Sequence, residues 1–219
     1  MLDTWESARP LTDDLEAVRW ARSRGLDAGD LEDRDLARVI PAGARLPAFA
    51  IFRGRSWAET HRLIVRKHGP TGKIESLHAR ALRPDVDVKS VSPAGFEVRG
   101  LVMADSLGRM LLERGHVHGV AEPTLVIAEG VPDYLTLATT WSDADEDAPA
   151  VMGILSGSWT PELAARVPDG AVVVIATDPD GAGDAYAATI VATFADRMRA
   201  GRVRVKRWRS QPGATAHEA

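Results

Sequence analysis

Hydrophobic positions form a repeating pattern of strands and helices in the second half of the chain. Continuous aliphatic runs occupy residues 124–128, 151–155, 171–176 and 203–208, and helical patterns lie between them at 132–140, 161–167 and 184–200. Such runs are typical of strands that are buried on both faces, and their alternation with helices predicts a parallel sheet. Since ligands of these sheets bind at the carboxyl ends of the strands, we expect the functional site there.

The first half of the chain predicts a mixed α+β arrangement. The pattern indicates an amphipathic helix over residues 11–24, strands at 48–52, 62–66 and 74–81, and a second helix over 105–115. The predicted fold class is therefore α/β, with an α+β part followed by a helix-covered parallel sheet. We expect domains at residues 1–120 and 121–210, followed by a flexible tail at 211–219.

Composition is that of an ordinary folded protein. Hydrophobic residues make up 45% of the 219 positions and charged residues 26%, which excludes collagen-like, coiled-coil and fully disordered chains. The absence of cysteine excludes disulfides, thiolate nucleophiles and cysteine-ligated zinc. There is no apolar run of about 18 residues and no hydrophobic leader, so we expect a cytoplasmic protein without a membrane partner.

Charge is distributed unevenly along the chain. Residues 51–100 contain 10 basic and 5 acidic residues, residues 101–150 contain 2 and 9, and residues 197–209 contain seven basic residues and no acidic one. Cationic surface beside clustered carboxylates suits an enzyme that holds nucleic-acid phosphates and binds a metal at the reacting bond. Ordinary solvated charge is the alternative.

Three carboxylates follow predicted strands and are the main chemical candidates. Glu129 comes directly after the run at 124–128, and Asp178 and Asp180 come just after the run at 171–176. The parallel sheet would bring them to one edge, where their mutual repulsion calls for a hard cation such as Mg²⁺ or Mn²⁺. Gly130 and Gly183 would allow tight turns and close approach of a phosphate to the backbone.

These residues resemble the signature of the Toprim family of metal-binding domains. Its pattern is Glu-Gly after one strand, here Glu129-Gly130, and Asp-x-Asp after a later one, here Asp178-Pro-Asp180. Gly157 fits the glycine-bearing loop of the family. Asp133 matches a further acidic position of DnaG-type primases, although a carboxylate stabilising the first turn of a helix is an equal alternative. The resemblance implies that Glu129, Asp178 and Asp180 are catalytic and bind metal, together with Asp133.

The region before the acidic motifs resembles the first half of the DnaG-type RNA polymerase core. A glycine turn and strand end at Arg80, a segment containing Lys89 follows, and Arg99 precedes Gly-Leu. The resemblance implies that these three residues contact the template, the nucleotide or the primer phosphates. The alternative for each is a solvated basic side chain.

The resemblance as a whole implies a primase core without zinc-binding and helicase domains. It would join ribonucleoside triphosphates into short RNA primers on single-stranded DNA, with the basic run at 197–209 also contacting phosphates. A phage, plasmid or other mobile element with a separate replicative helicase would suit such a core. The alternatives are a Toprim metal-dependent nuclease and a non-catalytic nucleic-acid-binding subunit of a replication complex. Three tryptophans could stack on bases, but we expect them to pack instead: Trp57, Trp159 and Trp208.

Overall fold

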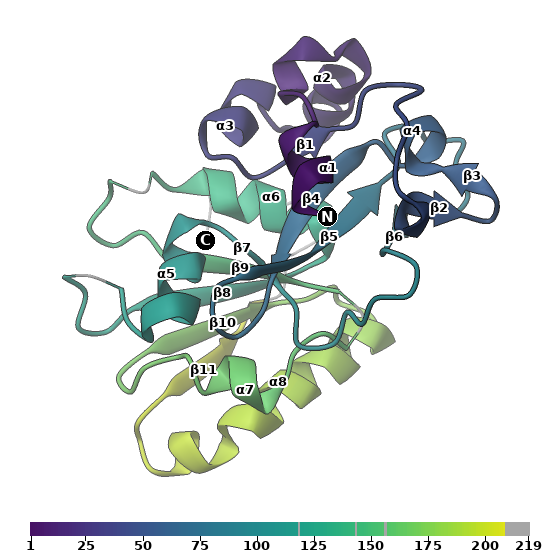
Figure 1. The fold of residues 1–219 in the computed structure, drawn as a ribbon. Coiled ribbons are helices and arrows are strands. Elements are labelled where there is room, and N and C mark those ends of the chain that lie inside the picture. The colour runs from purple at the N-terminus through teal and green to yellow at the C-terminus, as the bar shows by residue number, and fades with distance from the viewer. Residues whose placement is uncertain (118, 143, 156, 209–219) are drawn as a thin grey trace. The chain divides into compact units, whose positions relative to one another are not determined.

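A computed structural model describes residues 1–208 apart from 118, 143 and 156 (Figure 1). Its contacts divide the chain into two compact units. The first comprises Met1–Lys67 and Ile74–Val98, and the second comprises His68–Lys73 and the chain from Arg99 onward. The boundary expected at residues 120 and 121 lies within the second unit, and the expected tail at 211–219 lies outside the described residues.

The first unit is built on a four-stranded sheet. Its strands are β1 (Arg38–Val39), β4 (Leu63–His68), β5 (Ile74–Arg80) and β6 (Ser90–Val91), in the order β1-β4-β5-β6. The fully buried side chains of Trp5, Trp57 and Ile64 belong to its core. The other elements are α1 (Leu2–Glu6), η1 (Leu11–Asp13), α2 (Leu15–Arg22), α3 (Ala28–Asp33), η2 (Ala48–Ala50), β2 (Ile51–Phe52), β3 (Arg55–Ser56) and α4 (Trp57–Thr60).

Two elements of this unit differ from the sequence predictions. The helix predicted over 11–24 is divided at Asp14, which is extended at φ −130° and accepts hydrogen bonds from the N–H groups of Glu16 and Ala17. This cap begins a separate helix, α2, after the short η1. The strand predicted at 48–52 is wrong for residues 48–50, which form a 3-10 turn after Pro47; only β2 pairs, with β3.

The second unit contains the predicted parallel sheet. Its strands are β7 (Met103–Ala104), β8 (Thr124–Glu129), β9 (Ala150–Ile154), β10 (Val172–Ala176) and β11 (Arg204–Arg207), in the order β11-β10-β8-β9-β7. The four strands from β8 to β11 are parallel to one another, which confirms the α/β prediction. The edge strand β7 pairs antiparallel with β9 and was not predicted as part of this sheet.

Helices lie on both faces of the five-stranded sheet (Figure 1). The helices α5 (Ser106–Arg114), α7 (Pro161–Ala164) and α8 (Gly181–Arg199) share one core with the sheet. The helix α6 (Gly130–Thr140) packs against β8 and β9. The helix lies close to β9: a Cβ added to Gly153 of β9 would fall 2.7 Å from the Cβ of Tyr134 of α6. In the described part of the chain, no helix is long and apolar enough to cross a membrane.

Candidate functional site

The carboxyl ends of β8 and β10 bring two of the predicted carboxylates together. The strands are neighbours in the sheet, with Ala128 opposite Ala176, so Glu129 and the loop after β10 meet at one edge. The backbone N–H of Asp178 donates a hydrogen bond of 3.0 Å to Oε2 of Glu129. Glu129 is half-buried and Asp178 is exposed. Residues 49 positions apart are thus joined at this edge.

Asp180 and Asp133 lie in the helix starts that follow the two strands. Asp180 is the N-cap of α8, and its Oδ1 accepts a hydrogen bond of 2.8 Å from the N–H of Gly183. Asp133 is exposed in the first turn of α6, where the helix dipole favours a carboxylate. Both positions are consistent with either a metal ligand or a residue that stabilises a helix start.

Two of the predicted glycines are required by the backbone of the site. Gly130 has φ +78°, a left-handed conformation that favours glycine between β8 and α6. At Gly183 the reason is steric: a Cβ at this position would lie 2.1 Å from the carbonyl oxygen of Asp178, so a larger residue does not fit. Gly157 also has a positive φ, of +71°, in the loop after β9, but no atom lies within 4 Å of its Cβ position.

The electrostatics at this edge suit a cation. Burial raises the pKa of Glu129 above its usual value, the hydrogen bond from the Asp178 N–H opposes this, and the negative charges of Asp178, Asp180 and Asp133 raise the pKa further. Carboxylates are the ligands that Mg²⁺ and Mn²⁺ prefer, so the chemistry of the donors fits such an ion. Among the described residues, however, no three acidic or histidine side chains are already grouped closely enough to hold a metal.

Arg207, on β11, contacts the loop after β10 that carries Asp178 and Asp180. Its Nη2 donates to the hydroxyl of Thr177 and to the carbonyl oxygen of Asp178, each at 3.2 Å, and its Nη1 forms an ion pair with Asp184. The sequence placed Arg207 only within a basic run. Its register opposite Ile175, directly before Thr177, is a consequence of β11 pairing with β10.

The rest of the basic run at 197–209 is largely paired with carboxylates. Every arginine between residues 197 and 207 forms an ion pair, with partners Asp169, Asp196, Glu122 and Asp184. Lys206 has no ion pair among the described residues, and Arg209 lies outside them. The expected phosphate-binding run is therefore much less available than its composition indicates.

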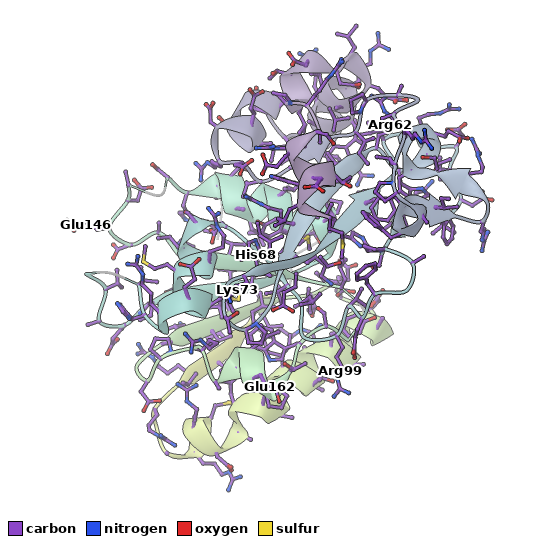
Figure 2. All side chains as sticks on the ribbon, viewed as in Figure 1. Arg62, His68, Lys73, Arg99, Glu146 and Glu162 are labelled. Atoms are coloured by element: carbon purple, nitrogen blue, oxygen red, sulfur yellow. The ribbon has the colours of Figure 1, made fainter. Side chains whose placement is uncertain are left out.

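The structure places two of the predicted basic residues in the first unit, Arg80 at the end of β5 and Lys89 directly before β6. Arg80 lies opposite Ser90 and donates from Nη1 to its hydroxyl at 3.2 Å. Lys89 is exposed, and its Nζ donates to the carbonyl oxygen of Pro84 at 2.7 Å. Arg99 is exposed in the second unit (Figure 2). The pKa of Glu162 is lowered first by its hydrogen bonds, and the positive charge of Arg99 adds to this effect.

Sequence reasoning missed two buried basic residues in the first unit. The side chain of Lys67 is 0% exposed, and desolvation lowers its pKa to about 8. His78 is also buried; desolvation, followed by the charges of Lys67, Arg80 and His61, lowers its pKa to about 3. Both residues lie on strands that contain many apolar positions, and alternation alone does not reveal that these polar side chains are inside.

The aromatic predictions are confirmed for two tryptophans. Trp57 is 0% exposed and Trp159 is 5% exposed, so both pack in the cores of their units. Trp208 is half-buried and lines a groove instead.

Comparisons with known proteins identify the fold. No family model matches the chain, and no curated protein matches its sequence. Solved structures share the fold. The structure of the DnaG catalytic core matches with a TM-score of 0.63 at 18% sequence identity, and the match covers 96% of this chain and 70% of the DnaG chain.

Two further structures agree with this match. The DnaG primase catalytic domain bound to ssDNA has a TM-score of 0.61 at 17% identity and covers 97% of this chain and 71% of its own. The RNA polymerase domain of Mycobacterium tuberculosis primase DnaG has a TM-score of 0.58 at 17% identity, covering 97% and 74% respectively. The chain described here therefore has the fold of the catalytic core of DnaG primases.

Proposed function

We propose that this chain is a primase-like nucleotidyltransferase that synthesises short RNA primers on single-stranded DNA. The observation that carries the proposal is the pairing of β8 with β10, which joins Glu129 to Asp178 at the carboxyl edge of a DnaG-like sheet. One of the similar structures is a DnaG catalytic domain bound to single-stranded DNA, which supports such DNA as the template.

The acidic edge would hold the metal. Glu129, Asp178 and Asp180 would bind Mg²⁺ or Mn²⁺, with Asp133 as a further ligand, in a Toprim-like arrangement. When bound, the ion supplies positive charge that stabilises the charge developing on the triphosphate. The Asp178 N–H holds one oxygen of Glu129 in place, and the Glu129 carboxylate would orient the ion and accept the proton of the primer 3′-hydroxyl.

Basic residues would bind the phosphates of the substrates. Arg80, Lys89 and Arg99 are the candidates that the resemblance indicates, and their contacts with the template, the ribonucleoside triphosphate or the primer stay predictions. A separate replicative helicase as partner, and an origin in a phage, plasmid or other mobile element, also stay predictions.

A primer-synthesis assay tests this function. The protein is incubated with single-stranded DNA, four ribonucleotides of which one is labelled, and Mg²⁺ or Mn²⁺. We expect short labelled oligomers from the parent and a loss of about 100-fold or more in Glu129→Gln and Asp178→Asn, because each removes a charge from the metal site. Glu146→Gln is the matched control, since Glu146 is exposed on the loop after α6 (Figure 2), and we expect it to keep full activity.

Other outcomes discriminate between the proposed function and its rivals. Full activity of a correctly folded Glu129→Gln protein would contradict the role of the acidic edge. Metal-dependent loss of the template without added nucleotides would indicate a nuclease. DNA binding that EDTA leaves unchanged, without synthesis or cleavage, would indicate a non-catalytic subunit.

A further inference from the structure

An open groove lies over the part of the five-stranded sheet formed by β8, β10 and β11. The groove has a volume of about 470 Å³, within the range of about 300–1,000 Å³ that is usual for small-molecule sites. The helix α6 packs over β8 and β9 and contributes only Leu137 to the lining. The lining residues are Thr124, Val126, Leu137, Trp141, Asp147, Pro149, Val174, Lys206, Arg207 and Trp208.

Two indole rings line this groove. Trp141 follows the last residue of α6, and Trp208 follows the last residue of β11; both are half-buried. The backbone N–H of Trp208 donates a hydrogen bond of 2.9 Å to the carbonyl oxygen of Ile175, which ties this residue to β10. A tryptophan on a fixed backbone, beside the aliphatic floor of a sheet, provides a flat apolar surface for another aromatic ring.

The charges at the groove complement a nucleotide. Lys206 is exposed and has no ion pair within the described ranges, whereas Arg204 is paired with Glu122 and Arg207 with Asp184. The Nε atom of Arg207 is buried without a hydrogen-bond partner in the described part of the chain. Lys206 is thus available for a phosphate, and the carboxylate of Asp147 can accept a hydrogen bond from the amino group of a base.

The neighbouring loop argues against a continuous nucleic-acid strand in this groove. Asp145, Glu146 and Asp147 are all exposed on it and have no ion pair among the described residues. A strand that followed the groove would carry phosphates past this loop, whereas a single nucleotide can keep all of its phosphates at Lys206. A single free nucleotide is therefore the occupant that this surface favours.

We propose that the groove binds a free nucleotide, with the base against the indole of Trp208 and the phosphates at Lys206. This binding site is separate from the proposed metal site, because it uses the face of the sheet and not the carboxylates at its edge. Arg207 lines the groove and also donates a hydrogen bond to the carbonyl oxygen of Asp178, so the groove adjoins the loop after β10.

Calorimetric titration with ATP and with adenosine tests the proposal. The titrations are made in EDTA and in an Asp178→Asn background, so that failure of the proposed catalytic function does not affect them. We expect Trp208→Ala to weaken the binding of both ligands by roughly 5-fold to 150-fold, the range known for base stacking on aromatic side chains, and Trp208→Phe to restore much of it. Lys206→Ala should weaken ATP binding and leave adenosine binding unchanged.

Arg199→Ala is the matched control for Lys206→Ala. Arg199 belongs to the same basic run, is exposed on α8 and is paired with Asp196, so its loss should leave the affinity for ATP unchanged. No binding of ATP, or binding that Trp208→Ala does not weaken in a protein with parental thermal stability, would overturn the proposal. Binding of a single-stranded oligonucleotide that depends on Trp208, without binding of ATP or adenosine, would also overturn it.

Discussion

Replacement of Gly183 by alanine should disrupt the acidic edge for steric reasons alone. The added Cβ would lie 2.1 Å from the carbonyl oxygen of Asp178 and 2.9 Å from its carbonyl carbon and its nitrogen. All three atoms belong to the backbone, so no side-chain rotation relieves the overlap. The loop would have to move by about 1 Å or more to restore ordinary contact, and such overpacking costs about 1–3 kcal/mol.

The displaced loop carries the hydrogen bonds of the site. The Asp178 carbonyl oxygen accepts from Arg207, and the Asp178 N–H donates to Glu129. Movement of this peptide therefore separates the carboxylates from the groups that position them. We expect Gly183→Ala to lower the affinity for Mn²⁺ about 10-fold or more, since supporting contacts of metal ligands typically contribute that much.

Gly181→Ala provides a matched control in the same helical turn. No atom lies within 4 Å of a Cβ at Gly181, so this variant should be neutral or more stable by up to about 1 kcal/mol. Urea denaturation at equilibrium would compare the free energies of unfolding, and calorimetric titration would compare the Mn²⁺ affinities. Equal stability and equal Mn²⁺ affinity in the two variants would refute the steric argument.

Substitutions at three positions test the electrostatics and the packing. The pKa of Glu129 is raised in the folded protein, so the protonated carboxyl stabilises the fold. This stabilisation is complete below the pKa of the unfolded chain, about 4.3, and is lost as the pH rises through the pKa of the folded protein. Glu129→Gln should therefore melt above the parent at pH 7 and show a flatter dependence of the melting temperature on pH; a lower melting temperature at pH 7 would contradict this. The pKa of Lys67 is lowered to about 8, so the folded state is stabilised as the pH rises from about 8 to the usual lysine value. Lys67→Met should abolish that rise in urea denaturation and be more stable at pH 7 by up to about 3 kcal/mol, and an unchanged rise would exclude Lys67 as its source. The buried Oδ1 of Asp105 accepts from the N–H groups of Gly108 and Val151, at 2.6 and 3.1 Å. Asp105→Ala should lower the free energy of unfolding by about 2–4 kcal/mol, because a helix cap is lost and a buried N–H is left unpaired, whereas Asp105→Asn keeps an acceptor and should cost less than about 1 kcal/mol in the same measurement.

Local sequence signals predicted most of the second unit. Aliphatic runs correctly located β8, β9, β10 and β11, because a strand buried on both faces needs apolar side chains at nearly every position. They also placed Glu129 and Asp178 at the carboxyl ends of strands, where the structure finds them. The first unit was predicted less well, since the cap at Asp14 and the turn after Pro47 interrupt patterns that otherwise look continuous.

The contacts of the charged residues were decided by tertiary structure. Strand order makes β8 the neighbour of β10, and only this neighbourhood joins the Glu129 carboxylate to the Asp178 N–H. The burial of Lys67 and the hydrogen bond from Arg207 to the Asp178 carbonyl oxygen likewise depend on residues distant along the chain. The sequence by itself determined which elements form and which carboxylates end the strands, because these follow from local periodicity. Which of the charged side chains in the described residues form ion pairs with one another was settled only by the packing of distant segments.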